Sequence, residues 1–440
     1  MHFTRLLTVV TVILPTIAGA PLEAKTGPQR RTHVLSLNRK PSIPSQRSRY
    51  LGLLQPQDPI NANVGSAMLK GLGDILYTTN ITFGTQSFEA IVDTGSSDTW
   101  AVQSGYRCVR GSPEISLPQA QCGFGAPVTL SPTFKQIPGQ NFKIAYADGE
   151  ELTGTVGTET VTLAGITVKN QEIGIVNHAY WNGDNSSSGL IGLAFPNLTS
   201  AYRGNDPTVA TESDAVPYNP LFTSMFTQGL VAPVFSIAIN RRGEETGGLL
   251  ALGGLPPVSH SNVFACTPLK MIATRHPGSG VNGTTIDAPL YKYYSIIVNG
   301  LVSRTGNKSV DIPIGSRRPT ADAPYTMHVD SGSTLIYVPE EAADTVNDMF
   351  VPRAEHNYST RQYDVDCNAK APDLAVKIAG QAFHINPADL IVKAPDGSCF
   401  SGVTAGYSEQ GVLGDVFLRN VVAVFDIGHL EMRFAAREFY

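Results

Sequence analysis

The sequence predicts an all-β protein with few short helices, built from two related halves. Short runs rich in Val, Ile, Thr, Tyr and Phe alternate with clusters of Gly, Pro, Asn and Ser, which is typical of strands joined by turns. Only 16% of the residues are charged, whereas Gly (42) and Pro (30) are frequent, and this composition favours a loop-rich β protein. A short motif centred on Asp occurs once in each half. Such a repeat indicates two lobes of related structure.

The first twenty residues, 1–20, have the three parts of a secretory signal peptide. Arg5 supplies the positive charge, Leu6–Leu14 the apolar core, and Ala18 and Ala20 the small residues that precede cleavage. The apolar core is too short to span a bilayer, no later segment reaches spanning length, and no lipid-anchor tail ends the chain. We therefore expect a secreted, extracellular protein without a membrane anchor, with the vacuole as the alternative destination.

Residues 21–64 differ in charge from everything that follows. They contain seven Lys and Arg against two acidic residues, a balance of +5, whereas residues 65–440 contain 24 basic and 35 acidic residues, a balance of −11. A basic leader on an acidic body predicts a propeptide held by electrostatic attraction. A basic arm that binds nucleic acid is the alternative. The signal peptide in front argues against that alternative, so we expect no nucleic-acid partner.

The remaining chain divides into an N-terminal β lobe, 65–245, and a C-terminal β lobe, 246–440. We expect the lobes to meet near the polar turn Arg241–Gly248. A helix is expected over Pro339–Met349, because this stretch begins after Pro and carries Glu early. The clearest candidate strands are Ile75–Phe83, Glu159–Leu163 and Tyr293–Val298.

The repeated motif is a tripeptide that follows an apolar run and precedes small hydroxyl residues. It is Asp-Thr-Gly at Asp93–Gly95 and Asp-Ser-Gly at Asp330–Gly332. Each copy is followed later in its half by two apolar residues and a Gly, at Leu190–Gly192 and Val412–Gly414. A single tripeptide of this kind is an ordinary turn. Two copies with matched downstream partners indicate one carboxylate from each lobe, which is what a water-activating acid–base pair requires.

These residues resemble the pepsin family of aspartic endopeptidases, especially its secreted fungal branch, the aspergillopepsins and penicillopepsins. The resemblance covers residues 73–436 and includes the run Val412–Asp426. It implies a bilobal, pepsin-like double β-barrel with pseudo-twofold related lobes and a central cleft, with Asp93 and Asp330 as the catalytic residues. It also implies protein and peptide substrates, no metal or organic cofactor, and a monomer.

Hydrolysis by such a pair needs one ionised carboxylate, which takes a proton from water, and one protonated carboxyl, which donates a proton to the substrate. Two acids held so close that both cannot ionise together supply both forms, and pepsin is itself the usual illustration of this coupling. The shared titration belongs to the pair, so neither Asp93 nor Asp330 is assigned as the acid or the base.

The resemblance also assigns supporting roles to the residues beside the aspartates. The glycines let the backbone turn and present amide groups to the carboxylates. The middle hydroxyl residues lock the two loops together, and the serines after each Gly bond the outer carboxylate oxygens. These residues are Thr94, Gly95, Ser96, Ser331, Gly332 and Ser333.

Phe142–Val156 is predicted to form a strand, a polar turn and a returning strand, and it matches the family's mobile flap over the cleft. Tyr146 stands at the flap tyrosine and Trp100 at its indole partner; the alternative is that both are plain core aromatics. Asp148 and Gly149 lie in the turn, where they are expected to meet substrate. Asp148 would accept a basic substrate side chain or, alternatively, bond the substrate backbone.

Four of the five cysteines are expected to form local disulfides. Cys108 and Cys122 are 14 residues apart, Cys367 and Cys399 are 32 apart, and both spacings resemble family disulfides. A secreted protein meets the oxidising conditions that such bonds need, so we expect Cys108–Cys122 and Cys367–Cys399. Cys266 is left over in an apolar run, and we expect it to be a buried free thiol.

Six Asn-x-Ser/Thr sequons are candidates for glycosylation in a secreted protein. They begin at Asn80, Asn185, Asn197, Asn282, Asn307 and Asn357.

Two residues depart from the family pattern. Ser188 stands in a supporting turn where Asp is usual. His328 lies two residues before Asp330, where an apolar residue is usual, and in a strand it would share a face with that aspartate. Its imidazole is either satisfied by a neighbouring group or charged throughout the acid range, where it would favour ionisation of the aspartate pair.

The sequence therefore predicts a secreted aspartic endopeptidase, made as a zymogen and active at acid pH. The alternative is a pepsin-fold binding or inhibitor protein without turnover. Such proteins usually lose a catalytic Asp or a flap residue, and Asp93, Asp330 and Tyr146 are all present. A two-carboxylate glycosidase would not explain the repeated Gly-containing motifs.

Overall fold

The computed structural model describes residues 76–241, 247–271, 291–305, 308–314, 325–394, 396–406 and 410–437, and the backbone alone of residues 33–39. The expected signal peptide, the leader apart from residues 33–39, and the sequons at Asn282 and Asn307 lie outside the described residues.

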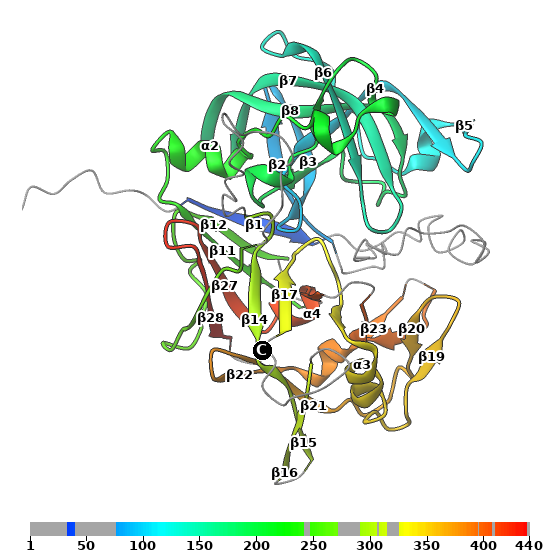
Figure 1. Ribbon diagram of the computed structural model, residues 1–440, viewed down its shortest axis with the longest axis vertical. Coiled ribbons are helices and arrows are strands. Elements are labelled where there is room, and N and C mark those ends of the chain that lie inside the picture. The colour runs from blue at the N-terminus through cyan, green and yellow to red at the C-terminus, as the bar shows by residue number, and fades with distance from the viewer. Residues whose placement is uncertain are drawn as a thin grey trace, which may run out of the picture.

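The described chain consists mainly of strands joined by loops, with a few short helices, and it divides into two lobes with a shared sheet between them (Figure 1). This confirms the predicted all-β, bilobal fold. The N-terminal lobe contains β2 (Tyr77–Phe83), β3 (Gln86–Asp93), β4 (Thr99–Arg110), β5 (Ile115–Leu117), β6 (Lys135–Ala145), β7 (Glu151–Leu163), β8 (Ile166–Tyr180), β9 (Gly189–Gly192) and β10 (Ala201–Arg203).

Six strands of the N-terminal lobe close into a barrel in the order β2, β3, β9, β4, β8, β7 and back to β2. Buried and partly exposed positions alternate along most of β7, as expected of a strand with one face on a core. The β7–β8 hairpin turns through Ala164 and Gly165, at φ values of 55° and 74°. Two positive φ values give a turn whose twist matches the flanking strands.

The sheet between the lobes includes a strand from the basic leader. β1 (His33–Arg39) pairs antiparallel with β12 through residues 33–37, and its last two residues pair with the start of β2. In Figure 1 this strand, in blue, lies between the two lobes. The other strands of this sheet are β11 (Val234–Ile239), β12 (Gly248–Leu252), β13 (Ala265–Pro268), β27 (Val421–Asp426) and β28 (Glu431–Ala436).

The C-terminal lobe is built on three smaller sheets. Its strands are β14 (Ser295–Val298), β15 (Gly300–Thr305), β16 (Lys308–Ile312), β17 (Tyr325–Val329), β18 (Ile336–Val338), β19 (Glu355–Asn357), β20 (Gln362–Asp364), β21 (Asp373–Ile378), β22 (Gln381–Ile385), β23 (Ile391–Lys393), β24 (Cys399–Ser401), β25 (Val403–Ala405) and β26 (Gly411–Leu413).

The helices of the described chain are short. The helix expected after Pro339 is present as α3, with Glu340 and Glu341 in its first turn. Acidic side chains there stabilise the helix by interacting with the positive end of its dipole. The α-helices are α2 (Leu221–Thr227), α3 (Glu340–Asn347) and α4 (Asp415–Leu418), and the 3₁₀ turns are η1 (Gln119–Cys122), η2 (Pro196–Leu198), η3 (Pro207–Val209), η4 (Glu212–Asp214) and η5 (Pro387–Leu390).

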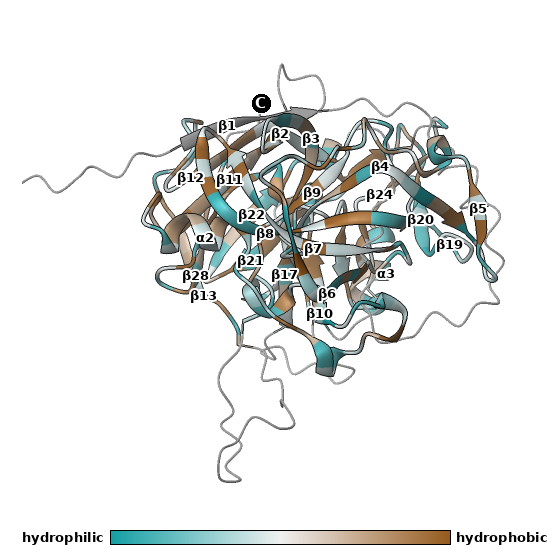
Figure 2. Cartoon of the chain, turned by 90° about the horizontal axis from the view of Figure 1, so that it is seen from above, coloured by the Kyte–Doolittle hydropathy of each residue, from teal (hydrophilic) through white to brown (hydrophobic). Residues whose placement is uncertain are grey.

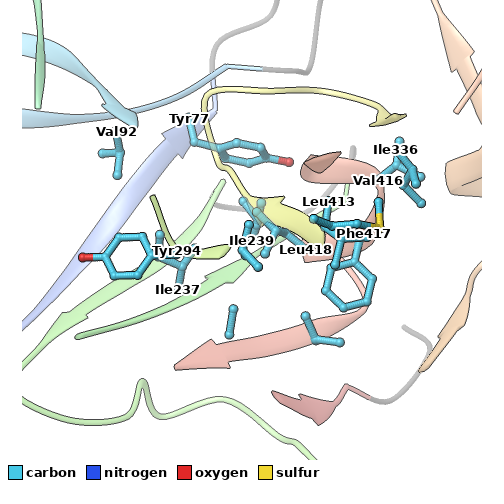
Figure 3. Close-up of a cluster of buried hydrophobic side chains, with 14 of the residues drawn as sticks. Tyr77, Val92, Ile237, Ile239, Tyr294, Ile336, Leu413, Val416, Phe417 and Leu418 are labelled. Carbon is cyan, nitrogen blue, oxygen red and sulfur yellow. The ribbon is translucent and has the colours of Figure 1, made fainter. Parts of the chain in front are cut away.

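One large hydrophobic core runs through both lobes and the sheet between them. In Figure 3, Val92 from β3, Ile237 and Ile239 from β11, and Phe417 and Leu418 from α4 belong to this core. Hydrophobic residues gather on the interior strands in Figure 2, whereas many of the connections are hydrophilic. The loops that carry the two Asp motifs are therefore mounted on packed strands. No helix of the described residues is long and apolar enough to cross a membrane.

Both expected disulfides, Cys108–Cys122 and Cys367–Cys399, are present, with Cα–Cα distances of 5.8 Å and 5.3 Å. The expectation that Cys266 is buried is wrong, because its side chain is exposed. β13 lies at the edge of the sheet between the lobes, and along it Ala265 and Thr267 are buried while Cys266 points outward. Because successive side chains of a strand point to opposite faces, one residue of an apolar run can be exposed while its neighbours are buried.

Candidate active site

The two Asp motifs end equivalent strands of the two lobes. In the N-terminal lobe β3 ends at Asp93 and runs parallel to β9, so that Asp93 lies opposite Gly192. In the C-terminal lobe β17 runs parallel to β26, with Val329 opposite Leu413. The downstream motifs thus form the strands beside the aspartates.

The glycine that ends each downstream motif is required by close packing. A Cβ at Gly192 would lie 2.4 Å from the carbonyl carbon of Ser97, and one at Gly414 would lie 2.4 Å from the backbone oxygen of Ser333. Both contacts are with backbone that cannot move aside, in the loop that follows each Asp. A glycine is therefore needed at both positions.

The two loops hold each other through a symmetric set of hydrogen bonds. Thr94 Oγ1 donates to the backbone oxygen of Val329 at 3.0 Å and accepts from the backbone N–H of Ser331 at 3.0 Å. In the opposite direction, Ser331 Oγ donates to the backbone oxygen of Val92 at 3.0 Å and accepts from the N–H of Thr94 at 3.2 Å. All these groups are buried, so the bonds fix one loop against the other.

Each carboxylate is held by its own loop. Asp93 accepts from the N–H of Gly95 at 2.7 Å and from Ser96 Oγ. Asp330 accepts from the N–H of Gly332 at 2.8 Å and from Ser333 Oγ at 2.6 Å. These bonds set the orientation of both carboxylates before any substrate arrives.

The two carboxylates also face each other across the interlocked loops. A Cβ at Gly95 would lie 2.5 Å from Asp330 Oδ1, and one at Gly332 would lie 2.5 Å from Asp93 Oδ1. Each glycine thus leaves room for the acid of the other lobe. The exposed fractions of Asp93 and Asp330 are only 4% and 8%, so this is a buried acid pair.

Burial raises the pKa of Asp93 well above its ordinary value, and the charge of Asp330 and a hydrogen bond from its side chain add to this rise. The bonds from Ser96 and Gly95 act in the opposite direction. Because two buried carboxylates this close repel each other when both are ionised, the pair holds one proton over a wide range of pH.

Two further buried acids follow the repeated motifs within a few residues in the sequence, and sequence reasoning missed both. Asp98 accepts from the N–H of Ser200 at 2.9 Å and from the hydroxyl of Tyr218 at 2.6 Å, and burial raises its pKa to about 6. Asp415, directly after Gly414, is fully buried, and burial raises its pKa well above the usual range, with the charge of Asp330 contributing. The only available signal was that each carboxyl lies within a few residues of a motif.

The expected flap is a hairpin between β6 and β7. Its turn is closed by a bond from the N–H of Tyr146 to the backbone oxygen of Glu150 at 2.8 Å. Trp100 Nε1 donates to the Tyr146 hydroxyl at 2.8 Å, which is the expected pairing. Asp148 Oδ1 accepts from the N–H of Glu150 at 3.1 Å and so shapes the turn. Gly149 has a φ of 89° and therefore favours glycine.

An aromatic cluster surrounds the Trp100–Tyr146 pair. Trp181 lies 5.5 Å from Trp100 and 5.7 Å from Tyr146, measured between ring centroids. Phe124 stacks on Trp181 at 5.6 Å, with the ring planes 2° apart. Sequence reasoning missed Trp181 and Phe124, since they come from segments that carry no motif.

His328 is held beside the site but does not behave as the charged group considered above. Its Nδ1 lies 2.8 Å from Ser295 Oγ, and its ring lies 4.5 Å from that of Tyr293. Burial lowers the pKa of His328 to about 4, against the opposing effect of Asp330. The contact with Ser295 agrees with the first of the two alternatives for His328, an imidazole satisfied by a neighbouring group, and the lowered pKa argues against one that is charged throughout the acid range.

Four sequons lie among the described residues, and their surroundings differ. Asn80 and Asn185 are exposed. Asn197 is half-buried, with Nδ2 3.5 Å from the backbone oxygen of Tyr291. Asn357 is half-buried and donates to Asp364 at 2.8 Å.

Comparison with known proteins shows which family the chain resembles and which fold it shares. The family model described as eukaryotic aspartyl protease matches residues 76–437. The chain is 41% identical to a probable aspartic-type endopeptidase of Aspergillus fumigatus, over 84% of this chain and 81% of that protein. It is 27% identical to penicillopepsin-1 of Talaromyces stipitatus, over 86% and 82%. The crystal structure of an aspartic proteinase from Irpex lacteus superposes with a TM-score of 0.58 and 17% identity, over 86% of this chain and 97% of that chain.

Proposed function

The chain belongs to the eukaryotic aspartyl protease family, and on that premise we propose that it cuts peptide bonds with a water molecule activated between Asp93 and Asp330. Its reaction class is that of an aspartic-type endopeptidase acting on protein or peptide substrates. The observation that carries the residue assignment is the pair of buried carboxylates, one from each lobe, on loops that hold each other in place.

The shared proton supplies both halves of the reaction. The ionised member of the pair accepts a proton from the attacking water, and the protonated member donates to the carbonyl oxygen of the scissile bond. Ser96 and Ser333 hold the outer oxygens, so the inner oxygens remain directed toward the water. The roles belong to the pair, because either Asp93 or Asp330 can carry the proton.

The flap hairpin would cover the bound peptide. Asp148 and Gly149 occupy its turn, next to Tyr146. Backbone groups of such a turn can bond an extended peptide, and closure over the site would exclude bulk water.

Substitution of the acid pair provides the first test. We expect Asp93→Asn and Asp330→Asn each to lower peptidase activity by at least a thousandfold, because an amide keeps the hydrogen bonds but cannot share a proton. Hydrolysis of denatured haemoglobin at acid pH, with and without a statine-type inhibitor, gives the activity, and thermal unfolding gives the stability. Turnover near the wild-type rate by either folded variant would contradict the mechanism. A wild-type protein that binds peptides but never cuts them would instead support the binding-protein alternative.

The finer expectations of secretion and zymogen activation rest on the N-terminal segments. We propose residues 1–20 as the signal peptide, residues 21–64 as the propeptide, and residues 65–245 and 246–440 as the two lobes. The zymogen proposal is supported by β1, a strand of the basic leader that pairs with β12 and β2 of the body. An extracellular destination is supported by the fungal relatives and by the two disulfides. We also propose that the protein is a monomer active at acid pH.

A further inference from the structure

Glu150, at the end of the flap turn, is buried to 1% exposure. A glutamate is rarely buried to this extent unless its carboxylate has a specific partner. One of its oxygens, Oε1, accepts from the backbone N–H of Asn182 at 2.7 Å. Asn182 follows the end of β8, so the side chain of Glu150 joins the flap turn to a different segment of the lobe.

The backbone of Glu150 is part of the turn itself. Its N–H donates to Asp148 Oδ1 at 3.1 Å, and its carbonyl oxygen accepts from the N–H of Tyr146 at 2.8 Å. A displacement of Glu150 would therefore move the Tyr146 backbone. The Tyr146 hydroxyl, which accepts from Trp100, would then lose its alignment.

The segment that receives Glu150 is itself anchored. Arg110 donates to Asn182 Oδ1 at 2.7 Å and to the backbone oxygen of Trp181 at 2.5 Å. The next residue, Gly183, donates its N–H to the backbone oxygen of Cys122 at 2.8 Å. Cys122 is covalently bonded to Cys108 on β4. The flap turn is thus tied to a part of the lobe that is fixed by an ionic side chain and a disulfide.

We propose that Glu150 is a positioning residue for the flap, and that its bond to Asn182 holds Tyr146 against Trp100 and Trp181. The feature that matters is the acceptor oxygen rather than the charge. A backbone N–H left without an acceptor in a buried site costs free energy, whereas an amide oxygen can replace a carboxylate oxygen. The expected effect on substrate binding rests on the proposed function, because it requires that the flap covers a peptide substrate. The anchoring of the flap turn does not.

The chain provides its own probe, because Trp100 and Trp181 are its only two tryptophans. Both contact Tyr146, so tryptophan fluorescence, excited at a wavelength where the 16 tyrosines do not absorb, and its quenching by acrylamide report on the region around Tyr146. We would compare Glu150→Ala, which removes the acceptor, with Glu150→Gln, which keeps it. Glu151→Ala is the matched control, since Glu151 is the adjacent residue and its side chain is exposed.

For Glu150→Ala we expect stronger tryptophan quenching and a KM raised roughly five- to tenfold, with kcat changed by less than about twofold, the size expected from loss of one buried hydrogen bond. Glu150→Gln and Glu151→Ala should match the wild type in quenching and KM. Wild-type quenching and KM in a folded Glu150→Ala protein would overturn the proposal, and so would a Glu150→Gln variant as impaired as Glu150→Ala.

The quenching measurement separates this inference from the proposed function. If the wild type cut no peptide, the activity assignment would fail, but a change of quenching confined to Glu150→Ala would still establish the anchor. If the wild type were active and quenching were unchanged in Glu150→Ala, the anchor alone would fail. Titration of a statine-type inhibitor, followed by the same fluorescence, gives the affinity without turnover, and we expect it to weaken only in Glu150→Ala.

Discussion

At the scale of single residues, Asp98 is a fully buried acid outside the proposed chemistry, and its environment differs strongly from water. Its Oδ1 has two donors, Ser200 and Tyr218, whereas its Oδ2 is buried without a hydrogen-bond partner in the described part of the chain. A carboxylate in that position is poorly solvated when ionised, which explains why the protonated form is favoured. The same residue would be unremarkable in a sequence, since it follows a turn of small polar residues.

The first residue-scale prediction concerns Asp98→Asn. Burial raises the pKa of Asp98 from 3.8 to about 6, so the native state holds this proton more tightly than the unfolded chain does. Stability is therefore lost as the pH rises through this window. Asn keeps the acceptor oxygen and cannot ionise, so we expect stabilisation of up to about 3 kcal/mol at pH 7 and little change at pH 4. Urea unfolding at pH 4 and pH 7 measures the difference in free energy of unfolding between the variant and the wild type. An equal difference at both pH values would contradict a raised pKa of Asp98 as its cause.

His328 is predicted to have the opposite pH dependence. Burial lowers its pKa from 6.5 to about 4, so the unfolded chain binds this proton more tightly, and stability is lost as the pH falls from about 6.5 to 4. His328→Gln keeps a partner for Ser295 but cannot become charged. We expect it to be more stable than the wild type at pH 4, by about 1–3 kcal/mol, with little difference at pH 7. The pH–rate profile above pH 4 should stay unchanged, and a shift there would indicate a charged imidazole after all.

At the scale of elements, the interlock between the two Asp loops is the unit that brings the carboxylates together. The hydroxyl groups of Thr94 and Ser331 take part in four buried bonds between loops that are 237 residues apart in sequence: two join these residues to each other, and two reach the backbone oxygens of Val329 and Val92. In the strand pairing of the described residues, neither loop pairs with a strand of the other lobe. The hydroxyl groups therefore carry most of the polar contact between the two motifs.

We predict that Thr94→Val, which keeps the shape of the side chain, destabilises the protein by about 2–4 kcal/mol, because it leaves two buried backbone groups without partners. Activity should fall at least tenfold, since the carboxylates lose their mutual alignment. Thr167→Val on β8 is a suitable control, as that residue is exposed. Thermal unfolding and kcat measure the two effects. Wild-type stability in Thr94→Val would mean that packing alone holds the loops.

The sequence predicted those elements that carry a local pattern. The doubled motif, the strands around it, α3, both disulfides and the hairpin at Tyr146 all have signals within a few residues. Glu150, Trp181 and Asp98 were missed because their roles come from contacts with segments distant in the sequence. Cys266 was misjudged for a related reason: an apolar run does not reveal that one face of its strand is exposed, so that alternate side chains point to solvent.

At the scale of the whole molecule, the sheet between the lobes joins the parts of the structure, because both lobes and strand β1 of the leader meet there. Arg241, near the end of the first half, binds Asp389 of the second through Nε at 2.9 Å and Nη2 at 2.8 Å. Asn420 joins this buried group by accepting from Arg241 at 2.5 Å. A buried charge pair of this kind is costly to break, so the lobes should unfold together. Among the described strands of this sheet, β1 comes from the proposed propeptide.

The last prediction is acid activation of the zymogen. The +5 leader should lie on the −11 body at neutral pH, because ionised acids attract it. Carboxylates with basic partners have lowered pKa values, so their contribution is present at higher pH and is lost as the pH falls through those values. We therefore expect the purified zymogen to be silent near neutrality and, on acidification, to lose roughly 40 to 50 residues, a length suggested by the break in composition.

Mass spectrometry after a brief acid pulse gives the length removed, and hydrolysis of a peptide substrate before and after the pulse gives the activity. An Asp93→Asn zymogen is the control. Its leader should detach from the surface in acid, but the chain should stay uncut, because we expect the zymogen to remove its leader with its own active site. Full activity at neutral pH with residues 33–39 still attached would show that the leader does not inhibit.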